Sequence, residues 1–210
     1  MRCGIESKAN PLEVPPVAVT IPALNFILER EKLKAVERRS RPLGMERLEN
    51  SAEHSWSLAL MAMTLGPQVD PGMDLLRVLK MLLLHDIVEI DAGDTFCYAD
   101  QTGKQEREQF AAERIFGLLP PERTAEFMAL WHEFEEATTP ESKFANALDR
   151  VMPLLQNHAN GGGSWVEHGI TVEQVLGRAR GVEGVSADLW RHVQDLVESA
   201  RVAGWLKSVP

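Results

Sequence analysis

The chain has 210 residues, of which 44% are hydrophobic and 25% are charged, and its formal net charge is -9. This length suits one domain with a full hydrophobic core. The acidic balance argues against a nucleic-acid partner, which needs a broad basic face to neutralise phosphates, but leaves small phosphorylated substrates open. Two cysteines are too few for a disulfide framework, and no segment reaches the roughly 18 apolar residues of a membrane span. We therefore expect a cytoplasmic protein without a membrane partner.

Helical spacing of apolar residues runs through most of the chain, and no segment shows the alternation of a strand. The proline-containing residues 1–20 predict an irregular N-terminal arm. The predicted helices span about residues 21–40, 51–66, 71–93, 103–119, 122–137, 140–155, 171–180 and 186–207. The fold class is therefore all-α, with a bundle of about eight helices.

Several helix ends carry recognisable signals. Asn50 or Ser51 is expected to cap the second helix, which Gly66-Pro67 should end, and Thr139-Pro140 combines an N-cap with proline at the first helical position. The glycine-rich residues 160–164 are the only stretch in the second half for which we expect flexibility.

A group of ionisable side chains follows an apolar helix at residues 82–94. His85 and Glu89 are four residues apart and Asp86 and Glu89 three apart, so on a helix each pair shares a face. Burying an imidazole and carboxylates side by side is unfavourable unless another group balances their charge. A bound divalent metal ion balances it most directly, because it takes neutral imidazole and ionised carboxylate as ligands.

Two further residues fit the same chemistry. His54 is expected in the first turn of the second helix, and Asp149 lies between Leu148 and Val151 on a largely apolar helix. A carboxylate in such a place requires either a metal ion or a basic partner, so a buried ion pair with arginine or lysine is the alternative to a metal site.

Three sequence motifs carry a family resemblance. They are Glu-Asn-Ser-Ala-Glu-His-Ser at residues 49–55, His-Asp-Ile-Val-Glu-Ile-Asp-Ala-Gly-Asp at residues 85–94, and Lys-Phe-Ala-Asn-Ala-Leu-Asp-Arg at residues 143–150. In this order they resemble the HD-domain superfamily of metal-dependent phosphohydrolases, and within it the 5′-deoxynucleotidase branch. The likeness covers roughly residues 22–160.

The resemblance implies specific roles. His54, His85, Asp86 and Asp149 would bind one divalent metal ion, and this mixed nitrogen and oxygen set suits Mn, Co, Fe, Ni or Zn better than Mg. Glu89 matches the position of the family's catalytic carboxylate, which would orient and deprotonate the attacking water. Asp94 would make a second polar contact, to the sugar or the leaving-group oxygen.

Substrate contacts match the family less closely. Related enzymes carry an arginine with a neighbouring aromatic residue before the first metal-binding histidine, and here that region reads Arg-Arg-Ser-Arg-Pro at residues 38–42. Arg39 and Arg41 are the candidates for phosphate binding, with Lys143 as a further cation. The absent aromatic residue weakens the case that the substrate is specifically a deoxyribonucleoside monophosphate.

The expected function is that of a phosphomonoesterase acting on nucleoside 5′-monophosphates. A phosphodiesterase or nucleoside triphosphate hydrolase of the same fold is one alternative, and a non-catalytic metal- or nucleotide-binding scaffold is another. We expect a phosphohydrolase domain at residues 21–160 and a C-terminal helical extension at residues 161–210 packed on it. A homodimer is expected by analogy with relatives, with the Trp-bearing C-terminal helices as a candidate interface.

Overall fold

The computed structural model describes residues 21–208, so the arm expected at residues 1–20 lies outside the described residues. The described part folds into ten α-helices and three short 3-10 helices and has no strand beyond two isolated bridges. The prediction of an all-α fold is therefore confirmed. The helices are α1 (Ile21–Arg30), η1 (Glu31–Ala35), α2 (Ser51–Val69), α3 (Leu75–Leu84), η2 (His85–Val88), α4 (Glu89–Ala92), α5 (Lys104–Phe116), α6 (Pro121–Glu136), α7 (Pro140–Ala159), α8 (Gly163–His168), α9 (Val172–Ala179), η3 (Arg180–Val182) and α10 (Ala187–Val202).

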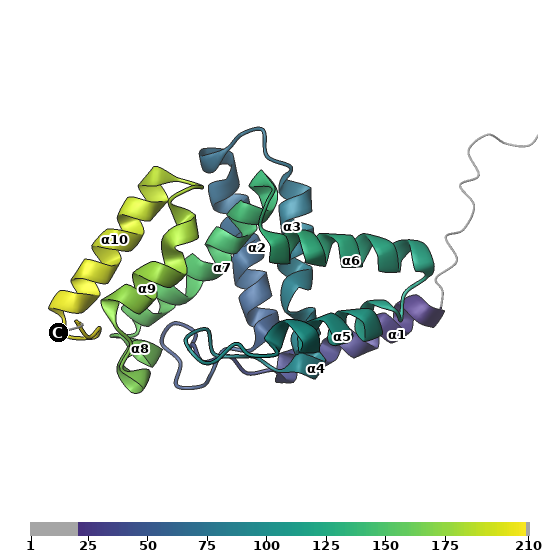
Figure 1. The fold of residues 1–210 in the computed structure, drawn as a ribbon, viewed down its shortest axis with the longest axis horizontal. Coiled ribbons are helices and arrows are strands. Elements are labelled where there is room, and N and C mark those ends of the chain that lie inside the picture. The colour runs from purple at the N-terminus through teal and green to yellow at the C-terminus, as the bar shows by residue number, and fades with distance from the viewer. Residues whose placement is uncertain (1–20, 209–210) are drawn as a thin grey trace, which may run out of the picture.

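Helix α7 joins two hydrophobic clusters. Figure 1 shows α2, α3 and α7 in the middle of the molecule, with α1, α5 and α6 at one end and α9 and α10 at the other. Leu148 of α7 belongs to the cluster shared with α2, α3, α5 and α6, whereas Val151 and Leu154 belong to the cluster shared with α8, α9 and α10. Asp149 therefore lies at the junction of the two clusters.

The first helix is shorter than predicted. Helical structure ends at Ala35 instead of residue 40, and the chain then pairs with the segment that leads into α2. The backbone N–H of Arg38 donates to the carbonyl of Glu49 at 2.8 Å, and that of Glu49 donates to the carbonyl of Ser40 at 2.9 Å. These bonds satisfy backbone groups that a helix would otherwise satisfy internally. Arg38 and Ser40 thereby reach the interior.

Helix α2 begins as predicted and ends later. The Asn50 side chain accepts a hydrogen bond from the backbone N–H of Glu53 at 3.0 Å, and Glu53 bonds back to the backbone of Asn50, which forms a capping box. The helix passes through Gly66-Pro67 and ends at Val69. Gly66 packs against Leu75 and Phe144, so tertiary packing maintains the helix where the local sequence predicts its end.

The long apolar helix predicted over residues 71–93 is interrupted. Its N-cap is Asp74, whose side chain accepts from the backbone of Arg77, and α3 ends at Leu84. One 3-10 segment and the short α4 follow, and Gly93 ends the run at a φ of 73°. Every residue from His85 to Glu89 is buried, because the tighter 3-10 winding turns this segment into the interior.

The second half contains one helix that the sequence analysis did not predict. Helices α5, α6 and α7 match their predictions, including the Thr139 cap and Pro140 at the first helical position, and α10 ends at Val202. Residues 160–164, predicted as flexible, lead into α8. A Cβ on Gly162, at a φ of 98°, would lie 2.6 Å from the Val166 side chain. Within residues 21–208, every helix is too short or too polar to cross a membrane.

Candidate active site

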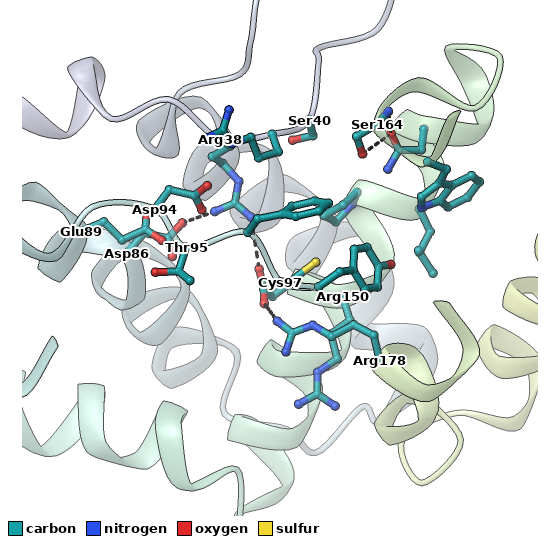
Figure 2. A pocket seen from close by; sticks show the side chains of 18 of the residues that line it. Arg38, Ser40, Asp86, Glu89, Asp94, Thr95, Cys97, Arg150, Ser164 and Arg178 are labelled. Atoms are coloured by element: carbon teal, nitrogen blue, oxygen red, sulfur yellow. Dashed lines mark hydrogen bonds and ion pairs between the residues drawn. The ribbon is translucent and has the colours of Figure 1, made fainter. Parts of the chain in front are cut away.

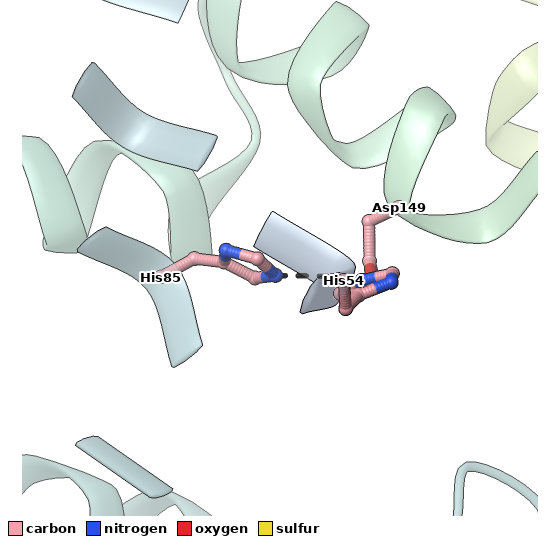
Figure 3. A group of neighbouring side chains, drawn as sticks. All are labelled: His54, His85 and Asp149. Carbon is pink, nitrogen blue, oxygen red and sulfur yellow. Dashed lines mark hydrogen bonds and ion pairs between the residues drawn. The ribbon is translucent and has the colours of Figure 1, made fainter. Parts of the chain in front are cut away.

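Side chains from α2, η2 and α7 meet at the junction of the two clusters. His54, His85 and Asp149 each offer one ligand atom, and these three atoms lie within 4.8 Å of one another (Figure 3). His54 Nε2 is 2.9 Å and His85 Nε2 is 3.8 Å from Asp149 Oδ1. Asp86 Oδ1 is 3.0 Å from His85 Nε2. The fold thus brings together all four residues that the sequence singled out as ligands.

The Nε2 atom of His85 is suited to bind a divalent cation. His85 Nδ1 donates to the carbonyl of Leu82 at 2.9 Å, because a carbonyl oxygen only accepts. In the neutral ring this leaves a lone pair on Nε2, which is buried, has no hydrogen-bond partner and faces the two carboxylates. Lone pairs and carboxylate oxygens converging on one point repel one another unless a cation lies between them. The arrangement therefore suits a divalent metal ion.

Charge at the cluster supports the same conclusion. Burial lowers the pKa of His85, but the charges of Asp86 and Asp149 outweigh burial and raise it to about 9. Burial raises the pKa of Asp149, but the adjacent rings of His54 and His85 hold that pKa well below its ordinary value. A proton on His85 thus supplies part of the positive charge that the carboxylates require, and a metal ion would replace it.

Glu49 lies next to the His54 ring nitrogen that faces away from Asp149, and it was not singled out in the sequence analysis. Its carboxylate accepts from Ser40 Oγ at 3.0 Å and from Gln156 Nε2 at 2.6 Å, and lies 3.6 Å from His54 Nδ1. Burial raises the pKa of Glu49, yet the neighbouring His54, followed by the hydrogen bond from Gln156 and the charge of Arg38, keeps it below its ordinary value. An ionised partner on the far nitrogen is a common way to orient a metal-binding histidine.

Glu89 and Asp94 line a cavity next to this cluster. Ser51 Oγ donates a hydrogen bond of 2.7 Å to Glu89 Oε2. Burial, followed by the charges of Asp86 and Asp94, raises the pKa of Glu89 to about 8, although Arg38 and Ser51 oppose this. Burial also raises the pKa of Asp94. Both carboxyls therefore hold a proton more tightly than exposed ones do.

Of the three cations predicted to bind phosphate, only Arg39 lines the cavity. Arg39 lines the cavity, but Arg41 pairs with Glu167 outside it, and Lys143 is exposed on α7 away from the cavity lining. Arg38 occupies the expected position instead, since its Nη1 donates to Asp86 Oδ2 at 2.8 Å and its Nη2 is 3.9 Å from Asp149 Oδ1. Because this segment pairs as extended chain and is not helical, helix spacing could not identify which arginine points inward.

The cavity extends well beyond the cluster. Its empty volume is about 870 Å³ including solvent at its mouth, and Figure 2 shows Asp86, Glu89 and Asp94 on one side with Arg150 and Arg178 on another. The rest of the far wall was not anticipated from the sequence and consists mainly of Phe96, Cys97, Tyr98, Pro153, Leu154, Asn157, Ser164 and Trp165. These residues come from a loop, α7 and α8, so no local spacing connects them.

Comparison with known proteins decides the family. The family model described as HD domain matches residues 30–190, which include the whole cluster and both walls of the cavity. The chain belongs to the HD domain family. The resemblance seen in the three motifs is thereby confirmed, and the match to the family model continues to residue 190, beyond the likeness in the motifs.

The curated proteins that match this chain are named as 5′-deoxynucleotidases. The chain is 33% identical over 115 residues to 5′-deoxynucleotidase HDDC2 of Homo sapiens, which covers 53% of this chain and 54% of that protein. It is 28% identical over 120 residues to 5′-deoxynucleotidase hdd1 of Schizosaccharomyces pombe, which covers 54% of this chain and 59% of the relative. The chain thus spans about half the length of the curated relatives it matches.

Solved structures match over a greater length. A protein described as a predicted metal-dependent phosphohydrolase from Magnetospirillum magnetotacticum MS-1 is 45% identical, with a TM-score of 0.85 over 88% of this chain and 94% of that one. The PH0347 protein from Pyrococcus horikoshii OT3 is 23% identical with a TM-score of 0.59 over 82% of this chain and 99% of that one, and at this identity it shows the shared fold alone.

Proposed function

We propose that this HD domain is a metal-dependent phosphohydrolase that releases phosphate from nucleoside 5′-monophosphates. One observation carries the proposal: Asp86, Asp149 and Glu89 line one cavity, and ring nitrogens of His54 and His85 lie within 4.8 Å of a carboxylate oxygen of Asp149. The names of the relatives, 5′-deoxynucleotidase and metal-dependent phosphohydrolase, support this substrate class.

The proposed ligands are His54, His85, Asp86 and Asp149, and the metal is one divalent ion of Mn, Co, Fe, Ni, Zn or Mg. When bound, such an ion lowers the pKa of a coordinated water and neutralises charge on a phosphate. The chain contributes the geometry. The Leu82 carbonyl fixes the His85 ring, and the buried Glu49 faces the far nitrogen of His54.

Glu89 is the proposed proton acceptor for the attacking water. Ser51 bonds one of its oxygens, and no hydrogen bond to the other occurs among residues 21–208. A carboxylate whose pKa lies near neutrality matches the requirement for a general base at that pH. Arg38 and Arg39 would contact the phosphate, and Asp94 the sugar or the leaving-group oxygen. No covalent intermediate is required, because water attacks directly.

Variants of the metal cluster test this function. Metal-reconstituted protein should release phosphate from nucleoside 5′-monophosphates faster than from triphosphates or cyclic diesters. His85→Ala should lose both bound metal and activity, whereas Glu89→Ala should keep metal and lose at least about a hundredfold in kcat, the usual range for general base removal. Metal content and phosphate release are the two measurements.

His192→Ala is the matched control, because His192 is an exposed histidine on α10 away from the cluster. It should retain both metal and activity. A Glu89→Ala protein with the wild-type phosphatase rate would remove Glu89 from the mechanism, and metal-loaded wild-type protein that hydrolyses none of these phosphates would refute the function. The homodimer and the cytoplasmic location also stay predictions.

A further inference from the structure

Two arginines on the far wall of the cavity lack ordinary partners. Arg150 of α7 makes no ion pair within 4.0 Å among residues 21–208, and its Nε is buried without a hydrogen bond. Within the described residues, Arg178 on α9 makes one ion pair, from its Nη2 to Asp149 Oδ2 at 3.9 Å, which is too long for a hydrogen bond. Burying part of a guanidinium without a partner is unfavourable.

The backbone of η3 leaves room for Arg150 at this wall. A Cβ added to Gly181 would lie 2.5 Å from Arg150 Nη1, so any larger residue there would displace the guanidinium. Burial and the nearby charge of Arg178 both lower the pKa of Arg150. Two positive charges are thus held close together although they repel each other, and an anion between them would remove the repulsion.

The pair faces a different side of Asp149 from the metal cluster. Asp149 Oδ1 lies near His54, His85 and Arg38, whereas Oδ2 faces Arg178. A phosphate bound at the cluster and Arg38 would lie on the Oδ1 side. Arg150 and Arg178 are therefore positioned for another part of the ligand.

We propose that Arg150 and Arg178 bind a second anionic group of the substrate, so that the preferred substrate is a nucleotide carrying a second phosphate besides the one that is hydrolysed. This inference rests on the proposed function, since it assigns the first phosphate to the metal cluster. Paired guanidinium groups match the geometry and charge of a phosphate. Both sites open into one cavity, because Arg150 and Arg178 line it together with Asp86, Glu89 and Asp149.

The test compares 2′-deoxyadenosine 3′,5′-bisphosphate with 2′-deoxyadenosine 5′-monophosphate. Metal-loaded wild-type protein should show a kcat/KM about tenfold to a hundredfold higher for the bisphosphate, the range for hydrogen bonds to a charged group. Arg178→Gln should abolish this preference, lowering the bisphosphate-to-monophosphate ratio of kcat/KM toward one. Gly181→Ala should also reduce it, by displacing Arg150.

Arg180→Gln is the control, because Arg180 is exposed two residues from Arg178 and does not line the cavity. It should retain the full preference. The second measurement is calorimetric binding of both nucleotides to metal-loaded Glu89→Gln protein, with and without Arg178→Gln. The bisphosphate should bind more tightly, and only while Arg178 is present.

The outcomes separate this inference from the proposed function. If the monophosphate is hydrolysed but the bisphosphate is not preferred, or if Arg178→Gln weakens both nucleotides equally, the second anion site is refuted and the phosphohydrolase stands. If neither nucleotide is hydrolysed but the bisphosphate binds more tightly through Arg178, the anion site stands and the hydrolytic function fails.

Discussion

Ser51 is a small residue that we expect to affect turnover through Glu89. It is fully buried at the first position of α2, and its hydroxyl bonds Glu89 Oε2 at 2.7 Å. Ser51→Ala should reduce kcat about tenfold to a hundredfold, because a hydrogen bond to a charged group contributes about 1.5–3 kcal/mol. KM and metal content should stay close to those of the wild type. Steady-state kinetics and metal analysis measure these effects.

Ser55 supplies the control for this variant. It is buried one turn along α2, and its hydroxyl bonds the carbonyl of Ser51 instead of Glu89. Ser55→Ala should therefore retain kcat. Equal losses in both variants would mean that Ser51 acts only through the packing of α2, and unchanged kcat in Ser51→Ala would rule out its positioning role.

At the scale of elements, one network ties the ends of α3, α6 and α7. Arg77 Nε donates to both oxygens of Glu133 at 3.0 and 2.8 Å, and Glu133 accepts from Thr139 Oγ1 at 2.7 Å. The hydrogen bond from Arg77 lowers the pKa of Glu133, burial opposes this, and Thr139 lowers it further. Thr139 is also the cap of α7, so this network fixes the start of the helix that carries Asp149.

The network should give a pH-dependent contribution to stability. The pKa of Glu133 in the folded protein lies below its ordinary value of 4.5, so the stabilisation is complete above about pH 4.5 and is lost as pH falls through the folded pKa. Glu133→Gln should lower the free energy of unfolding by about 1 kcal/mol at neutral pH, since Arg77 is half exposed. Urea titrations at several pH values measure this difference.

Glu136→Gln is the comparison, because Glu136 is exposed near the same end of α6 and makes no ion pair within the described part of the chain. Its unfolding free energy should follow the wild type at every pH. A difference between Glu133→Gln and wild type that persists unchanged at pH 3 would show that the carboxylate charge is not responsible.

At the scale of the whole molecule, α7 contributes to both hydrophobic clusters. Leu148 packs in one and Val151 in the other, less than one helical turn apart. We therefore expect the metal-free full-length chain to unfold in one cooperative transition, with the segment at residues 161–210 unfolding together with residues 21–160. Differential scanning calorimetry should give equal calorimetric and van't Hoff enthalpies. Two separated transitions would show that the extension is an independent unit.

The expected dimer also belongs to this scale. The C-terminal tryptophans proposed as an interface, Trp190 and Trp205, are partly buried against the second cluster. Exposed large apolar side chains also lie on α2, where Trp56, Leu60 and Met63 follow one another at helical spacing. Light scattering on purified protein would establish whether the chain forms a dimer at all.

The sequence by itself determined the features that depend on neighbouring residues. Asn50, Thr139 and Gly93 mark helix ends through local hydrogen bonding and backbone conformation, and apolar spacing predicts the helices. The motif around His85 and Asp86 and the lone carboxylate of Asp149 also indicated a candidate metal-binding site, because buried charges of this kind require a metal ion or a basic partner.

Only the tertiary structure decided which side chains form the rest of the cavity. Arg38 points inward instead of Arg41 because its segment pairs with the chain before α2, a contact that helix spacing does not encode. Arg150 and Arg178 lie near each other because α9 packs against α7. They are 28 positions apart, so local spacing along the sequence does not predict that they are neighbours. Local signals determine the elements, whereas burial between elements determines which charges face one another.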